Sequence, residues 1–196
     1  MKKIRVAVIG VGLMGQNHAR VYTELPNCEL VAVSDLDEEK AKAVASKFNC
    51  KYYTDHKELV EKEKVEAVSI AVPTKNHKEV AIDVIKKNLN LLLEKPISNN
   101  VKDAEDIIKK AKEKKVKFLV GHIERFNPAV TKLKKIIDED KIGPICSIIA
   151  KRVGTFPPRI KDANIVIDVS VHDIDIIRYL MGRNPDKVWK AKQSKC

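Results

Sequence analysis

The chain has 196 residues, of which 44% are hydrophobic and 33% charged. That length allows one complete domain and part of a second. No apolar run approaches the ~20 residues of a membrane-spanning helix, and the apolar N-terminal stretch runs into a glycine turn, not a signal-peptide cleavage site. The four cysteines form no CxxC pair. This argues against a metal site or disulfide framework and indicates a cytoplasmic protein.

The formal net charge of +11 raises nucleic acid as a possible partner. The lysines are interleaved with acidic residues, however, as in DAEDIIKKAKEKK at 103–115. Such a pattern is typical of the solvent face of a helix. No recognition helix, zinc spacing or RNA-binding motif accompanies the charge, so we do not expect nucleic-acid binding.

Between residues 3 and 121, short apolar runs alternate with segments of helical periodicity. Alternation of this kind predicts a parallel sheet with crossover helices. The expected strands are 4–9, 30–35, 51–54, 66–72, 90–95 and 117–121, and the expected helices are 14–25, 38–48, 56–62, 76–88 and 101–114. This number and order predict a doubly wound α/β Rossmann domain over residues 1–121.

The rhythm changes over residues 122–196. A helical pattern follows Asn127 with Pro128 in its first turn, and another, within 165–182, ends at Gly182. Segments 144–154 and 186–195 are expected to be strands. We therefore expect the N-terminal part of an α+β domain, truncated before its sheet is complete, because a stable sheet usually needs three or more strands.

A glycine motif follows the first expected strand and begins a helical pattern. It consists of Gly10, Gly12 and Gly15, with Leu13 and Met14 inside it. In a dinucleotide site, the first glycine permits the tight turn, the second admits the pyrophosphate and the third lets helix and strand pack closely. The pyrophosphate then lies at the helix N-terminus, where free N–H groups favour an anion.

Asp35 ends the second expected strand, at the spacing of a ribose-binding carboxylate. A carboxylate accepts hydrogen bonds from both ribose hydroxyl groups of NAD and repels the 2′-phosphate of NADP. The cofactor prediction is therefore NAD. The alternative is that Asp35 only caps the helix beginning near Glu38, a role that Asp37 could also fill.

The loop after the fourth expected strand contains Pro73, Thr74 and His77. These residues are candidates for a second cofactor-facing turn. The alternative is an ordinary strand-to-helix loop with Thr74 as the helix N-cap. The sequence leaves both possibilities open.

Glu94, Lys95 and Pro96 end the fifth expected strand at the sheet edge where open α/β folds bind ligands. A lysine before a proline is ordinarily a surface residue. Its position at this edge, and a second polar cluster elsewhere in the chain, favour a site instead.

The second cluster is Asp168, His172 and Asp175, which are spaced to share one helix face. A carboxylate one turn before a histidine can orient the ring for proton abstraction near neutral pH. The alternative is a half-buried helix with a hydrogen-bonded structural histidine.

Together, GVGLMG, the Asp35 strand end, VPTKNH, EKP and DVSVHDID resemble the glucose-fructose oxidoreductase, inositol dehydrogenase and MocA (Gfo/Idh/MocA) family. The resemblance implies hydride transfer between nicotinamide and a sugar or polyol carbon. It makes Lys95 the catalytic lysine and matches Asp168 and His172 to the family's acid and histidine. It also places Glu94 and Pro96 beside the nicotinamide, with a peptide bond before Pro96 that is often cis.

Within that family, segments 121–130 and 152–160 most resemble the branch that oxidises the 3-hydroxyl of UDP-N-acetylglucosamine. Arg152 and Arg159 would then bind the nucleotide-sugar pyrophosphate; the alternative is a solvated strand edge. Relatives extend beyond this length, so we expect an incomplete substrate site, and the unfinished sheet favours a homo-oligomer. The rival interpretations are a non-catalytic NAD-binding regulator and a truncated inactive homologue.

Overall fold

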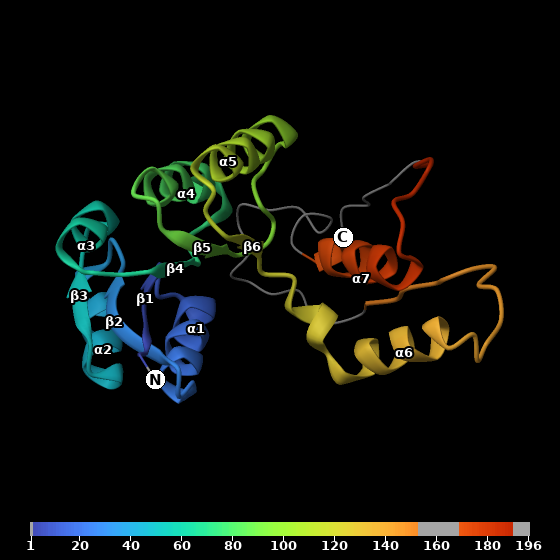
Figure 1. The fold of residues 1–196 in the computed structure, drawn as a ribbon, viewed down its shortest axis with the longest axis horizontal. Coiled ribbons are helices and arrows are strands. Elements are labelled where there is room, and N and C mark those ends of the chain that lie inside the picture. The colour runs from blue at the N-terminus through green and yellow to red at the C-terminus, as the bar shows by residue number, and fades with distance from the viewer. Residues whose placement is uncertain (1, 153–168, 190–196) are drawn as a thin grey trace, which may run out of the picture. The chain divides into compact units, whose positions relative to one another are not determined.

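A computed structural model describes residues 2–152 and 169–189 of the chain (Figure 1). The chain divides into two compact units, Met1–Gly121 and His122–Cys196. No helix within the described ranges is long and apolar enough to cross a membrane.

The first unit is built on a six-stranded parallel sheet with the order β3-β2-β1-β4-β5-β6. The strands are β1 Ile4–Ile9, β2 Cys28–Ser34, β3 Lys51–Tyr53, β4 Ala67–Ile70, β5 Asn90–Leu93 and β6 Phe118–Val120. The central strands are almost continuous runs of apolar residues because helices cover both faces of the sheet. This strand order is that of the Rossmann fold, so the predicted fold of this region is confirmed.

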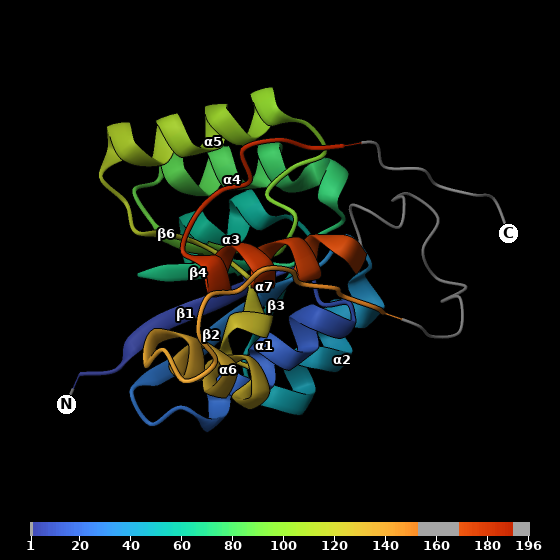
Figure 2. The same ribbon diagram turned by 90° about the vertical axis from the view of Figure 1, so that its right-hand side faces the viewer.

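Helices cover the sheet on both faces (Figure 2). They are α1 Leu13–Glu24, α2 Glu38–Phe48, α3 His56–Lys62, α4 His77–Lys86 and α5 Val101–Lys114. One apolar core lies between the sheet and the α1/α2 layer, and a larger one lies beneath α3, α4 and α5. The side chains of Asp37, Asp55 and Asn100 cap α2, α3 and α5, respectively. These caps explain why each of the three helices begins where the sequence predicts.

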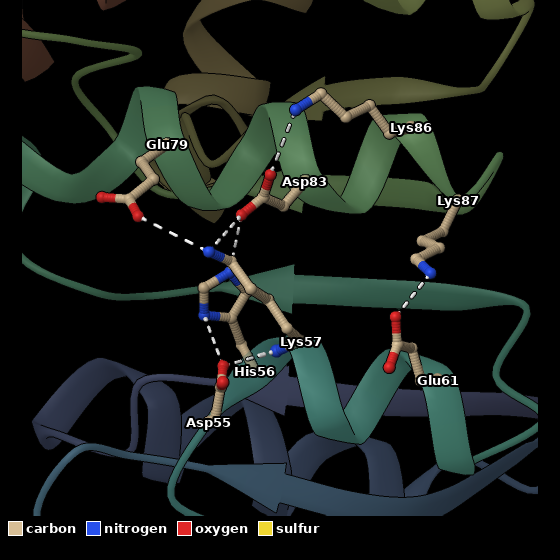
Figure 3. Close-up of polar contacts among 8 residues, drawn as sticks. All are labelled: Asp55, His56, Lys57, Glu61, Glu79, Asp83, Lys86 and Lys87. Atoms are coloured by element: carbon tan, nitrogen blue, oxygen red, sulfur yellow. Dashed lines mark hydrogen bonds and ion pairs between the residues drawn. The ribbon is translucent and has the colours of Figure 1, made fainter.

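Polar contacts connect α3 to α4 on the outside of the first unit (Figure 3). His56 Nε2 lies 3.3 Å from Asp83 Oδ2, and Lys57 Nζ lies 3.5 Å from the same oxygen. Partial burial raises the pKa of Asp83, but the hydrogen bond from His56 and the charge of Lys57 outweigh it, so the net pKa is lowered. Lys87 and Glu61 add an exposed pair at 2.8 Å. Such surface pairs each contribute little to stability.

The second unit contains the 3₁₀ helix η2 Ile123–Phe126 and the helices α6 Pro128–Asp138 and α7 Val171–Met181. Asn127 caps α6 through the backbone N–H of Ala129, and Pro128 occupies the first turn. Gly182 ends α7 in the left-handed conformation, with φ of 64°. The two helices predicted for this region are therefore confirmed within the described residues.

The two strands predicted for the second unit are wrong where the structure describes them. Residues 144–152 and 186–189 form no strand, while 153–154 and 190–195 lie outside the described residues. A strand requires a hydrogen-bonded neighbour, and none of the described residues of this unit provides one. The order of side chains along a segment can favour a strand, but it does not show whether a neighbouring strand is available.

Two neighbouring isoleucines on α5 test the core assignment. Ile107 is fully buried, whereas Ile108 is 37% exposed. Ile107→Ala should lower the free energy of unfolding by about 2–5 kcal/mol because it leaves a cavity. Ile108→Ala, the matched control, should cost about 1 kcal/mol or less. Urea denaturation of both variants measures the difference, and equal losses would contradict this packing.

Candidate active site

The glycine motif connects β1 to α1, and each of its three glycines meets a different constraint. Gly10 has φ of +84°, and a Cβ there would lie 2.8 Å from the carbonyl carbon of Ala71. A Cβ on Gly15 would lie only 1.8 Å from the carbonyl oxygen of Gly10. A Cβ on Gly12 would meet no protein atom within 4 Å. Packing of the protein therefore does not explain why residue 12 is glycine. The open space beside it fits a bound ligand that approaches the backbone closely.

The N-terminus of α1 opens beside this space. Its N-cap is Gly12, no side chain caps it, and its first turn holds no acidic residue. Leu13 is 61% exposed and Met14 is half-buried. Backbone N–H groups and the positive end of the helix dipole are thus left for an anion. This arrangement fits the pyrophosphate of a dinucleotide.

Asp35 follows β2 directly, and its carboxylate is fixed beside the glycine turn. Its Oδ2 accepts a hydrogen bond from Val11 N at 2.8 Å, and its Oδ1 accepts one from Asp37 N at 3.0 Å. The cap of α2 is Asp37, which accepts from Lys40 N at 3.1 Å. Capping, the alternative role for Asp35, is therefore filled by Asp37. Each carboxylate oxygen of Asp35 keeps a lone pair for a ribose hydroxyl.

The loop after β4 leads through the 3₁₀ helix η1 Thr74–Asn76 into α4. Pro73 precedes η1, and the N-cap of α4 is Asn76, so Thr74 does not cap α4. His77 is 1% exposed, and its Nδ1 and Nε2 lie 2.9 Å from Pro96 O and 3.0 Å from Val72 O. Burial lowers the pKa of His77.

The ring nitrogens of His77 are turned toward the protein, although the sequence made this residue a candidate for contact with the cofactor. Both ring nitrogens face backbone carbonyl groups of the protein, and the neutral ring donates a hydrogen bond to one of the two. The ring thus lies between the loop after β4 and the turn after β5. We accordingly treat His77 as a positioning residue, not as a direct ligand of the cofactor.

Glu94, Lys95 and Pro96 follow β5 at the same edge of the sheet, and the Lys95–Pro96 peptide bond is cis, as the resemblance implies. Glu94 is 7% exposed. Its Oε1 lies 2.9 Å from His18 Nε2, and its Oε2 accepts from Lys95 N at 3.2 Å. Burial raises the pKa of Glu94, but the hydrogen bonds from His18 and Lys95 N outweigh that effect and leave the pKa lowered.

The candidate residues of the second unit lie on and beside α7. His172 lies in its first turn and is half-buried. Asp175 is 3% exposed and accepts two hydrogen bonds from Arg125, at 2.8 and 2.6 Å. Arg152 pairs with Asp173 at 2.9 Å and does not lie on a strand edge. The remaining candidates lie outside the described residues: Asp168 and Arg159.

The first unit thus gathers its candidates at the carboxyl ends of β1, β2, β4 and β5, where parallel α/β sheets bind ligands. Sequence reasoning missed three residues behind this edge: His18, Tyr22 and Ser69. His18 follows the polar residues Gln16 and Asn17 and carries no motif of its own. Only the packing of α1 on the sheet shows that it contacts Glu94.

Comparison with known proteins defines the class. Residues 4–122 match the oxidoreductase family with an NAD-binding Rossmann fold, and residues 130–195 match the GFO/IDH/MocA C-terminal domain. The chain belongs to the Gfo/Idh/MocA family of oxidoreductases. The predicted family, the NAD cofactor class and the two-part fold are confirmed.

Several relatives are dehydrogenases. UDP-N-acetylglucosamine 3-dehydrogenase of Acidithiobacillus ferrooxidans is 32% identical over 94% of this chain and 56% of its own length. NAD-dependent scyllo-inositol 2-dehydrogenase of Bacillus subtilis is 35% identical over 92% and 54%. The solved structure of the Acidithiobacillus enzyme matches with a TM-score of 0.82, covering 93% of this chain and 58% of that one. The chain thus spans about half the length of these relatives.

Two glycines separate folding from ligand binding. Gly15→Ala should destabilise the fold by about 3 kcal/mol or more, because backbone atoms occupy the place of the new methyl group. Gly12→Ala should change stability by about 1 kcal/mol or less but weaken NADH binding at least about tenfold, through loss of the close backbone approach. Thermal unfolding and fluorescence titration with NADH measure the two effects. Unchanged NADH affinity in Gly12→Ala would show that the space above the turn is not the cofactor site.

Proposed function

We propose that this protein is an NAD-dependent oxidoreductase that transfers hydride between nicotinamide and a hydroxyl-bearing carbon of a sugar or nucleotide sugar. The observation that carries the proposal is the common edge of the sheet. There the open glycine turn follows β1 and the Asp35 carboxylate, fixed to Val11 N, follows the adjacent strand β2. The Glu94–Lys95–Pro96 turn follows β5, which β4 separates from β1. A dinucleotide extended along this edge would meet groups suited to pyrophosphate, ribose and nicotinamide in turn.

Each group has a proposed role in the reaction. NAD supplies a hydride acceptor when it is bound. The N-terminus of α1 and Asp35 hold the pyrophosphate and the adenosine ribose. The Lys95 ammonium group stabilises negative charge on the reacting oxygen, where burial strengthens electrostatics.

The second unit provides the base in this proposal. His172 takes the proton from the reacting hydroxyl, and Asp168 holds the histidine in its useful tautomer. In this division of labour residues 1–121 bind the cofactor and residues 122–196 contribute to the substrate site.

For the substrate we propose the 3-hydroxyl of UDP-N-acetylglucosamine. The name of one relative, the Acidithiobacillus enzyme whose solved structure also matches, supports it. Arg152 and Arg159 would bind the pyrophosphate of the nucleotide. Arg152 would have to exchange Asp173 for the phosphate, which a bidentate guanidinium can do at an exposed site.

Asp35 should set the choice between NAD and NADP. The protein should bind NADH more tightly than NADPH because the carboxylate repels a 2′-phosphate. Asp35→Ser should reduce or remove this preference. Asp37→Ser is the matched control: it keeps a side chain able to cap α2 and the backbone N–H that binds Asp35, loses the ion pair with Lys40, and should leave the preference unchanged. Fluorescence titration with both cofactors measures the preference. An NADH preference that survives Asp35→Ser would refute the proposed role of Asp35.

Lys95 should be needed for turnover. In any preparation that oxidises UDP-N-acetylglucosamine or an inositol, Lys95→Ala should lower kcat by about 10²-fold or more, through lost charge stabilisation. NADH affinity should stay within a few-fold. The control is Lys102→Ala, which removes an exposed lysine from α5. NADH formation followed by absorbance measures the rates, and a near-normal kcat in Lys95→Ala would exclude the proposed role.

A further inference from the structure

A chain of polar side chains runs beneath the candidate site from α1 through β4 to β5. Tyr22 OH lies 2.6 Å from Ser69 Oγ, which lies 3.1 Å from His18 Nδ1. His18 Nε2 lies 2.9 Å from Glu94 Oε1. Ser69 is fully buried, and the side chains of His18 and Glu94 are only 11% and 9% exposed. This series of hydrogen-bonded side chains therefore joins α1 to the turn that carries Lys95.

Donors and acceptors along this chain fit one direction. Glu94 is held as a carboxylate, which accepts hydrogen bonds only, so His18 Nε2–H is the donor to it. In the neutral ring Nδ1 then accepts from the Ser69 hydroxyl, and Ser69 Oγ accepts from Tyr22. The pKa of Tyr22 is raised by burial, which keeps the phenol protonated as a donor. In this arrangement the hydroxyl protons of Tyr22 and Ser69 and the Nε2 proton of His18 each form one hydrogen bond.

The Glu94 carboxylate is held from three sides. His18 binds one oxygen, and the backbone N–H of Lys95 binds the other. On the third side is Gly121, where a Cβ would lie 3.0 Å from Glu94 Oε1. The end of this turn also has a polar neighbour, because Pro96 O lies 2.9 Å from His77 Nδ1. The turn thus meets His18 at its start and His77 at its end.

Stability alone is a weak reason for such an arrangement. Replacing a buried pair of this kind with apolar side chains of similar volume is often neutral or stabilising. A buried carboxylate whose two oxygens are both bound does, however, fix the backbone that follows it. Here that backbone is Lys95–Pro96.

We propose that His18 is a positioning residue for the nicotinamide end of the cofactor site. By holding Glu94 it fixes the Lys95–Pro96 turn in the geometry that nicotinamide requires. The adenosine end is held separately, by Asp35 and the glycine turn. The proposal rests on the proposed function, because it assumes that the Glu94–Lys95–Pro96 turn meets the nicotinamide.

Two ligands separate the ends of the site: NADH, and ADP-ribose, which lacks the nicotinamide. His18→Leu should weaken NADH binding about tenfold, the effect of losing one hydrogen bond to a charged group, and leave ADP-ribose affinity within about twofold. His18→Gln, whose amide can still donate to Glu94, should recover most of the loss. Arg20→Leu, an exposed change on the same helix, should alter neither affinity. Calorimetric titration measures all four proteins.

Several outcomes would overturn the proposal. Equal losses for both ligands in His18→Leu would indicate support of the fold alone, and unchanged NADH affinity would exclude the role. If His18→Leu does not fold, Ser69→Ala replaces it. That variant removes the hydroxyl that orients the His18 ring at Nδ1 and should weaken NADH binding selectively.

A measurement on the unaltered protein is independent of any variant. The ¹⁵N shifts of the His18 ring should show a proton on Nε2, and a ring protonated only on Nδ1 would contradict the proposal. If the unaltered protein binds neither NADH nor ADP-ribose, the proposed function fails as well. If it binds both but His18→Leu does not discriminate between them, only the role of His18 fails.

Discussion

The contact between Gly15 and the carbonyl oxygen of Gly10 determines how α1 lies on the sheet. With a hypothetical Cβ only 1.8 Å from that oxygen, the helix lies closer to the β1 turn than any side chain would allow. This approach brings the helix N-terminus to the carboxyl edge of the sheet. It also brings His18, one turn further along, within reach of Ser69 and Glu94. One close packing contact therefore determines both the position of the uncapped N-terminus of α1 and the contact of that helix with the Glu94–Lys95–Pro96 turn.

Local chemistry made much of the first unit predictable. The observed bounds of α2, α3 and α5 equal the predicted ranges 38–48, 56–62 and 101–114, because capping side chains fix where each helix begins. The glycine motif and Asp35 were recognisable because their spacing follows from the shape of a dinucleotide. His18 was not recognisable, since its partners come from β4 and β5, far away in sequence. His77 was recognisable as part of a loop, but its two carbonyl partners depend on the turn after β5.

The second unit shows the same division between local and distant causes. Pro128 and Gly182 mark the start of α6 and the end of α7 through their own backbone preferences. The segment at 144–152 is apolar enough to predict a strand but has no pairing partner among the described residues. The ion pairs Arg125–Asp175 and Arg152–Asp173 join positions 50 and 21 residues apart. No spacing rule predicts pairs of that kind.

Gly121 bears on where the Rossmann unit of this chain could be fused to the second unit of a relative. It is the last residue of the first unit, and a Cβ there would lie only 3.0 Å from Glu94 Oε1. A recombination point just before it would place any incoming side chain against Glu94, whose carboxylate would have to shift unless the incoming sequence also has glycine there. A point after it would leave the surroundings of Glu94 unchanged. Chimaeras that keep this glycine with the Rossmann unit should retain the native surroundings of Glu94 while receiving their second unit from another relative.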